Sequence, residues 1–178
     1  MIHPPYLAFY LESMRTNCEL AFESIDLLNM EFGNFEKKTQ KEIAQNAVIN
    51  QVQNIVIQAG NLSKFFFPVT KKTIHQERGN ELCSLLGIDS SSPLSNKTLR
   101  NAIEHLDERI DIYFQQPRSG FFFPCYVGFE PKDEERLGNF FRAYFVDTKK
   151  FRILSEEVEI IPLVEEINKC YERITAET

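Results

Sequence analysis

Apolar residues recur at intervals of three and four positions in the N-terminal part of the chain, a spacing typical of helices that bury one face. The first such segment extends to about Glu31, and its predicted inner face consists of Leu7, Tyr10 or Leu11, Met14, Cys18, Ala21 or Phe22, Ile25 and Leu28. The second starts near a capping box of Thr39 and Glu42 and ends at about Phe67, before Pro68. Its predicted inner face consists of Ile43, Ala47, Val52, Ile55, Val56, Ala59, Leu62 and Phe66. The pattern therefore predicts two long amphipathic helices.

Two shorter helices are predicted to follow. Thr73 with Gln76 forms another capping box, and Gly87 is a typical stop signal, so a short helix is expected between them. Asn96 is a candidate N-cap for a fourth helix that reaches about Gln116. The core face of this fourth helix is predicted to consist of Leu99, Ile103, Leu106, Ile110 and Tyr113. Together the four segments predict a helical bundle.

The pattern changes from Pro117 onward. Aromatic runs at Phe121–Phe123 and Phe140–Phe145, separated by glycines and prolines, are typical of strands and turns. Residues 139–147 and 150–160 are expected to pair as an antiparallel hairpin. A final amphipathic helix is predicted after Pro162, with Val164, Ile167, Cys170 and Tyr171 turned inward.

The predicted fold is therefore mainly α. Residues 1–116 are expected to form a four-helix bundle, and residues 117–178 an extension of a short antiparallel β-element and a final helix, packed on the bundle. A chain of 178 residues is long enough to bury a sizeable core in this way.

Composition and charge narrow the class of protein. The net charge of −6 and the pI near 5.2 argue against broad, non-specific binding to nucleic-acid backbones. The N-terminus has no basic segment followed by an apolar run, and no stretch approaches the roughly 20 apolar residues of a membrane span. We therefore expect a cytoplasmic protein without a membrane partner. The four cysteines are scattered, and we interpret them as buried thiols; no metal or cofactor is expected.

A short polar motif stands at the start of the predicted fourth helix. Arg100, Asn101 and His105 occur in the sequence RNAIEH. This pattern, on the last helix of a predicted four-helix unit, resembles the HEPN superfamily (higher eukaryotes and prokaryotes nucleotide-binding domains). In that family the Arg, the polar residue after it and the His form a metal-independent ribonuclease site, commonly assembled where two subunits pair. The resemblance implies a homodimer, an RNA or nucleotide ligand, and a catalytic site at these three residues; Glu104 and Arg109 beside them are candidates for substrate binding.

The chemistry of these side chains suits RNA cleavage. A histidine can remove the proton of a 2′-hydroxyl or protonate the leaving oxygen, and an arginine can stabilise the charge that the phosphate gains in the transition state. Asn101 could orient the phosphate or the imidazole. On an ideal helix, however, Arg100 and His105 project about 140° apart. A long Arg side chain, a frayed first turn or a dimer that joins the Arg of one chain to the His of the other would each resolve this, and we favour the dimer.

Less specific interpretations stay open for the same residues. His105 could be a surface histidine beside Glu108 or Arg109, and the carboxylates of this helix could form a salt-bridged outer face. The apolar Ile112 in line with Asn101 and His105 instead favours a non-catalytic homodimeric interaction or regulatory module, or a site for a protein regulator. His75 is expected to be exposed. The aromatic runs after Phe121 are more typical of a strand face than of a base-stacking surface.

Overall fold

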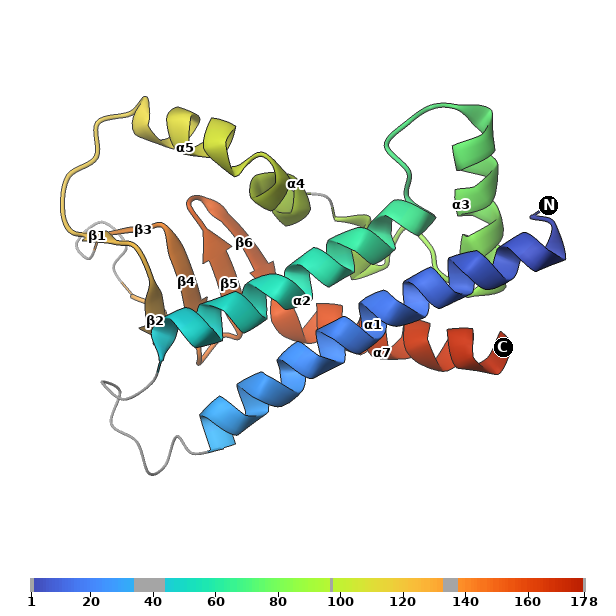
Figure 1. The fold of residues 1–178 in the computed structure, drawn as a ribbon. Coiled ribbons are helices and arrows are strands. Elements are labelled where there is room, and N and C mark those ends of the chain that lie inside the picture. The colour runs from blue at the N-terminus through green and yellow to red at the C-terminus, as the bar shows by residue number, and fades with distance from the viewer. Residues whose placement is uncertain (1, 34–43, 97, 133–137, 178) are drawn as a thin grey trace.

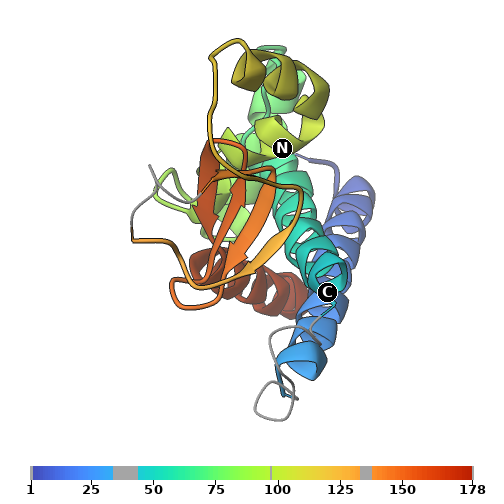
Figure 2. The ribbon, with the colours of Figure 1, turned by 90° about the vertical axis from the view of Figure 1, so that its left-hand side faces the viewer.

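The computed structural model describes residues 2–33, 44–96, 98–132 and 138–177, and in them a mainly helical chain with a small sheet and a C-terminal helix. Helices α1 (Pro4–Gly33) and α2 (Gln45–Phe66) lie side by side, with the chain reversing direction between them (Figure 1). Seen from the side, α2 lies between α1 and the sheet (Figure 2). This position explains why α2 is buried on more than one face.

Most of the side chains buried on α1 and α2 confirm the predicted inner faces, but Ala47 is half-buried and the fully buried Val48 and Ile49 were not predicted. On α1 they include Leu11, Met14, Cys18, Ala21 and Leu28, and on α2 they include Val52, Ile55, Val56, Ala59, Leu62 and Phe66. Helix α2 ends before Pro68, as predicted. The predicted capping box of Thr39 and Glu42 and the inward position of Ile43 lie outside the described residues.

Helix α3 (Thr73–Leu85) begins and ends as predicted, but its N-terminus is built differently. The predicted capping box does not form: the amide of Gln76 donates instead to the carbonyls of Pro68 and Thr70, at 3.3 and 2.8 Å. The chain turns after the helix at Gly87, where φ is +56°, a conformation that glycine adopts without strain.

The sheet is mixed rather than wholly antiparallel. Strands β4 (Arg142–Phe145), β5 (Lys150–Ile153) and β6 (Glu156–Glu159) are antiparallel neighbours. The predicted hairpin is confirmed for β4 and β5, but residues 150–160 form two strands rather than one, because the chain turns at residues 154–155. Strand β2 (Tyr126–Gly128) pairs with β4 in parallel, and the short strands β1 (Phe122–Phe123) and β3 (Asn139–Phe140) form a second parallel pair. The prediction of a purely antiparallel element was wrong because a long connection separates each parallel pair, so the chain can return to the same end before the second strand begins.

Helix α7 (Ile160–Glu177) follows β6 directly and starts two positions before the predicted Pro162. Its buried side chains include Ile167 and Cys170, as predicted, and also Leu163 and Ile174. The helix runs beneath α1 and α2 (Figure 1). Among the described helices, none combines the length and the apolar content of a bilayer span.

One cluster of buried side chains joins the helices to the sheet. It contains the fully buried Met14 on α1, Ile55 on α2, Phe151 on β5 and Ile167 on α7. Removal of this apolar surface from water is the main force that holds the sheet on the helices. A smaller cluster of Phe140, Ala143 and Phe145 lies apart from it, against Phe123 and Tyr126.

Candidate functional site

The predicted fourth helix is two helices, α4 (Thr98–Glu104) and α5 (Leu106–Phe114). His105 lies between them, with φ −119° and ψ 42°, so the expectation of one continuous helix to Gln116 was wrong. The backbone hydrogen bonds continue across the bend, because the N–H of His105 donates to the carbonyl of Asn101 and the N–H of Arg109 donates to the carbonyl of His105, both at 3.0 Å. The join is therefore a bend and not a loop. We call residues 98–114 the α4–α5 arm.

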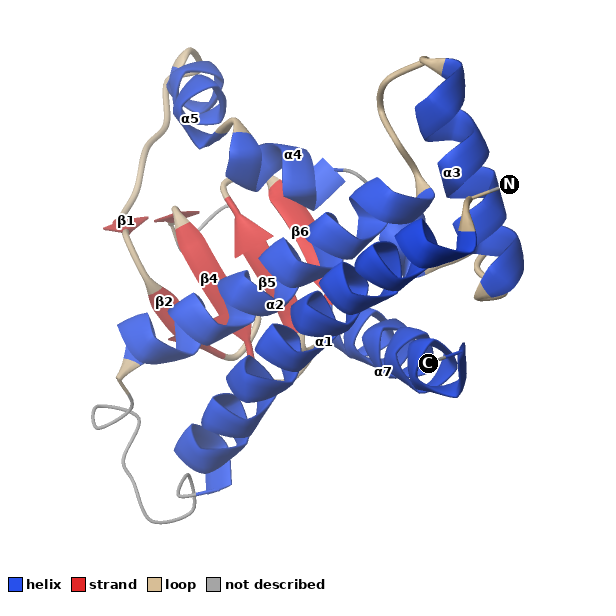
Figure 3. Cartoon of the chain, turned by 45° about the vertical axis from the view of Figure 1, so that its right-hand side comes forward, coloured by secondary structure: helices blue, strands red, loops and turns tan. Residues whose placement is uncertain are grey.

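The two halves of the arm lie against different parts of the molecule, and this gives the bend a physical reason. Helix α4 packs on α2 and on the β5–β6 side of the sheet, whereas α5 extends above the other end (Figure 3). The hydroxyl of the buried Tyr113 donates to the side-chain oxygen of Asn139 on β3, at 3.3 Å. At the start of the arm the side chain of Asn96 accepts a hydrogen bond of 2.9 Å from the N–H of Thr98, as expected of a cap.

The three motif residues lie along this arm. The side chain of His105 is exposed at the bend, and Asn101 is half-buried one turn before it. The backbone of Arg100 is part of α4, but its side chain lies outside the described part of the structure. A meeting of Arg100 and His105 at one phosphate therefore stays a prediction.

Glu104 and Arg109, the predicted substrate-binding residues, both have partners on the body. Glu104 forms an ion pair with Lys64 near the end of α2. Arg109 approaches Glu156 at the start of β6, with 3.5 Å between the nitrogen and the oxygen. These two ion pairs tie the two halves of the arm to the helices and to the sheet, and the exposure of their side chains keeps each contribution modest.

A groove that the sequence did not predict lies between α2 and α3. This α2–α3 groove has a volume of about 730 Å³ and opens to solvent. Its lining residues are Asn17, Asn61, Lys64, Phe65, Pro68, Val69, Thr70, His75, Arg78 and Glu104. It brings Lys64, His75 and Arg78 together from two helices, beside the carboxylate that the arm contributes. Only the spacing of His75 and Arg78, three residues apart on one helix face, could have indicated it from the sequence.

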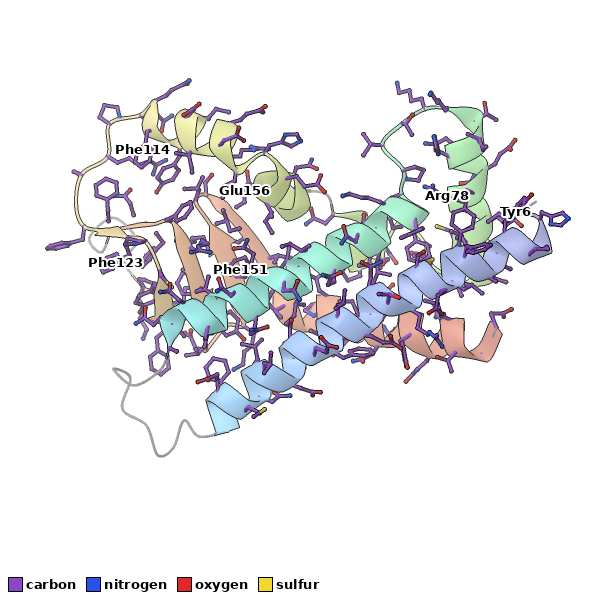
Figure 4. All side chains as sticks on the ribbon, in the orientation of Figure 1. Tyr6, Arg78, Phe114, Phe123, Phe151 and Glu156 are labelled. Atoms are coloured by element: carbon purple, nitrogen blue, oxygen red, sulfur yellow. The ribbon has the colours of Figure 1, made fainter. Side chains whose placement is uncertain are left out.

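Several contacts fix the position of Arg78, which is labelled on α3 in Figure 4. One of its terminal nitrogens donates to the carbonyl of Lys64 at 2.9 Å. The guanidinium lies 5.9 Å from the ring centroids of both Tyr10 and Phe65, within the range of cation–π attraction. Its Nε is buried and has no hydrogen-bond partner within the described residues.

A close approach of the two helices shapes the same groove. A Cβ at Gly79 would lie 2.7 Å from the carbonyl oxygen of Phe66 and 2.9 Å from the Cδ of Pro68. Any residue with a side chain would push α3 away from the end of α2. Glycine therefore sets the distance between the walls of the groove.

A second hollow, about 480 Å³ in volume, lies between α5 and the turn that joins β5 to β6. Its arginines are already paired: Arg152 with Glu157, and Arg118 with Tyr113, whose ring centroid is 3.5 Å from the guanidinium carbon and whose carbonyl accepts from Nε at 3.0 Å. Contacts with neighbouring side chains and backbone therefore hold both of these arginines.

The cysteines show no activated thiol. Burial raises the pKa of both Cys18 and Cys170 to about 12, and also raises the pKa of Cys83 and Cys125. Such thiols stay protonated at neutral pH and are poor nucleophiles. Cys18 and Cys170 are buried, as predicted, while Cys83 and Cys125 are half-buried. Within the described ranges, no group of three or more His, Cys, Asp or Glu side chains is arranged to hold a metal ion.

Comparison of the chain with family models, with curated proteins and with solved structures gives no match.

Proposed function

We propose that this chain is an HEPN-like endoribonuclease that cleaves RNA without a metal ion. In this proposal α1, α2, α3 and the bent α4–α5 arm are the four helices of the HEPN-like unit. The observation that carries it is the exposure of His105 at the bend of the arm, with Asn101 one turn before it. An imidazole in this position is open to a substrate and to a second subunit.

The bend also changes the argument about the spacing of the motif. The separation of about 140° between Arg100 and His105 holds for an ideal helix, and the backbone of His105 departs from helical geometry. Besides a long Arg side chain, a frayed first turn or a dimer, the bend is therefore a further way in which the two side chains could act on one phosphate. We still favour a homodimer, in which the arginine of one subunit serves the histidine of the other.

In the proposed reaction, His105 removes the proton of a ribose 2′-hydroxyl. The 2′-oxygen attacks the adjacent phosphorus, the bond to the 5′-oxygen breaks, and that oxygen takes up a proton as it leaves. Arg100 stabilises the charge on the phosphate oxygens, and Asn101 orients the phosphate. The products are a 2′,3′-cyclic phosphate and a 5′-hydroxyl.

The test is cleavage of mixed RNA in EDTA by the full chain. We expect His105→Ala and Arg100→Ala to lower the rate at least about 100-fold, the usual contribution of a general acid or base. His3→Ala is the matched control, since it removes an exposed histidine at the other end of the molecule. Cleavage that is absent in the wild type, or that survives both substitutions, would contradict the proposal. Mass spectrometry of the products should find the cyclic phosphate.

A second candidate function is a non-catalytic interaction module, and the apolar surface of the arm favours it. Ile112 is 58% exposed and Phe114 is 56% exposed, although both side chains are large and apolar. If this surface mediates self-association, Ile112→Lys should convert a dimer to a monomer in sedimentation experiments. A monomeric wild type would contradict both this candidate and the dimeric form of the nuclease.

A further inference from the structure

We infer that the α2–α3 groove binds a nucleotide, with its phosphate on Lys64, His75 and Arg78 and its base against Phe65 and Val69. The inference rests on the proposed function in one respect: it names the part of an RNA strand that the protein would hold beside the arm. It assigns a role to residues that the reaction itself does not use.

The charge of the groove fits a phosphate. Lys64 on α2 and His75 and Arg78 on α3 line it, and Glu104 is the only carboxylate among the described lining residues. Lys64 and Arg78 each carry a positive charge and Glu104 a negative one, so the groove has a small positive excess in a chain whose net charge is −6. Phosphate oxygens accept charge-assisted hydrogen bonds from all three types of side chain, and these are stronger than bonds between neutral groups.

The apolar part of the groove fits a base. Phe65, Pro68 and Val69 line it beside the cations, and Val69 is 68% exposed. Inorganic phosphate would gain nothing from these side chains, but a flat aromatic base can stack on them and remove them from water. Asn17 and Asn61 add polar groups to the same lining. The volume of about 730 Å³ lies within the range of roughly 300–1,000 Å³ for small-molecule sites.

The structure of Arg78 supports a binding role over a purely structural one. Its hydrogen bond to the carbonyl of Lys64 stabilises the end of α2, and this explains one terminal nitrogen. It does not account for His75, which lines the same groove. The guanidinium lies within cation–π range of both Tyr10 and Phe65, and these contacts hold it in place before a ligand binds.

The ion pair between Lys64 and Glu104 connects the groove to the motif. A phosphate in the groove competes with Glu104 for the ammonium of Lys64. Binding therefore weakens an ion pair that links the arm to α2, directly before His105 in the chain. Removal of the competing carboxylate should strengthen binding.

The experiment uses the full chain carrying His105→Ala, so that a bound RNA is not cut. Fluorescence anisotropy would report the binding of a labelled hexauridylate strand, with AMP and inorganic phosphate as competitors. We expect Lys64→Gln, at an exposed site, and His75→Gln, at a site that is half-buried rather than exposed as predicted, each to weaken binding by roughly tenfold or more. Glu104→Gln should tighten binding, and Lys169→Gln, on α7 outside the groove, should leave it unchanged. Arg78→Lys keeps the charge while it removes the planar fork, and it should weaken binding without loss of the fold.

The outcomes separate the possible ligands. If AMP competes at concentrations similar to those at which the strand binds, the groove binds a free nucleotide. If the strand binds much more strongly than AMP, the groove binds a nucleotide unit of RNA. An affinity for the strand that is unchanged in the groove variants, or equal competition by phosphate and AMP, overturns the inference. If the wild type cuts no RNA but the strand still binds through Lys64 and His75, only the nuclease proposal fails. If cleavage depends on His105 but is unchanged in the groove variants, the groove inference fails and the nuclease proposal stands.

Discussion

The packing around α2 and the packing of the α4–α5 arm differ sharply. Helix α2 lies between α1 and the sheet, and side chains such as Ile55 and Val52 are fully buried. On α5 only Tyr113 is buried, and Ile112 and Phe114 stay largely exposed. The residues with candidate chemistry lie on the less firmly packed element. Local stability is expected to follow the same contrast, with the arm opening more readily than the core.

The largest effect is expected in the core. Phe151→Ala removes a fully buried ring from β5 and should lower the free energy of unfolding by about 3–5 kcal/mol. Phe114→Ala on the arm removes the same ring from an exposed position, and it should change stability by about 0.5 kcal/mol or less. Urea unfolding followed by circular dichroism measures both. Similar losses for the two variants would contradict the difference in packing.

High pH should weaken the core through its two buried thiols. The pKa of Cys18 and Cys170 rises from the ordinary 9.0 to about 12 in the folded chain, because burial disfavours the thiolate. Between these values the unfolded chain loses protons that the folded chain keeps. Their contribution to stability is therefore complete below about pH 9 and decreases toward pH 12, by at most about 1.4 kcal/mol per pH unit for each thiol.

Urea unfolding at several alkaline pH values measures this decrease. The double variant Cys18→Ala and Cys170→Ala should show a smaller slope than the wild type, whatever its stability at neutral pH. Cys125→Ala, at a half-buried site, is the control and should alter the slope less. An unchanged slope in the double variant would assign the alkaline effect to other groups.

A smaller effect should follow from a methyl group at the base of the α2–α3 groove. Gly79→Ala would place its Cβ 2.7 Å from the carbonyl oxygen of Phe66, and the resulting shift of α3 should cost about 1–3 kcal/mol. Gly33→Ala is the matched control, since a Cβ there meets none of the described residues within 4 Å. The control should leave thermal unfolding unchanged or slightly raise its midpoint. Equal stability of both variants would show that the groove walls can separate at no cost.

The smallest expected effect concerns the ion pair between the arm and β6. Arg109→Gln removes the contact with Glu156, and because both side chains are partly exposed it should cost about 1 kcal/mol or less. Hydrogen exchange at the amides of α5 should nevertheless become faster, since this contact helps to hold the arm. Arg15→Gln, which breaks a pair with Glu12 within α1, should leave exchange in α5 unchanged. Faster exchange in α5 from both variants would mean that the pair at Arg109 has no specific role.

The differences between prediction and structure have particular causes. The inner faces of α1, α2 and α7 followed from their own spacing, because each helix buries a face that its sequence already marks as apolar. The bend at His105 did not, since the apolar spacing continues through it and only contacts with α2 and the sheet divide the helix. The parallel pairing of β2 with β4 was missed for a similar reason: strand composition does not encode the direction of a partner.

The candidate site divides in the same way. The sequence marked Arg100, Asn101 and His105 as a motif, and the structure describes where two of these side chains lie. No pattern in the sequence indicated that Lys64 on α2 and Arg78 on α3 would line the same groove, because the residues of a groove are brought together by packing and not by spacing along the chain. The close approach at Gly79, which shapes that groove, likewise depends on the end of a different helix.

By itself, the sequence determined that the chain is mainly helical, where its long helices end, which faces they bury, and that a hairpin precedes a final helix. These features depend on neighbours a few positions away, through local hydrogen bonds, proline and glycine geometry, and the period of the apolar residues. The tertiary structure alone decided the bend of the arm, the mixed sheet and the convergence of three basic side chains in one groove. Each of these depends on contacts between segments far apart in the chain, and the strength of such contacts is set by burial and distance in the folded molecule.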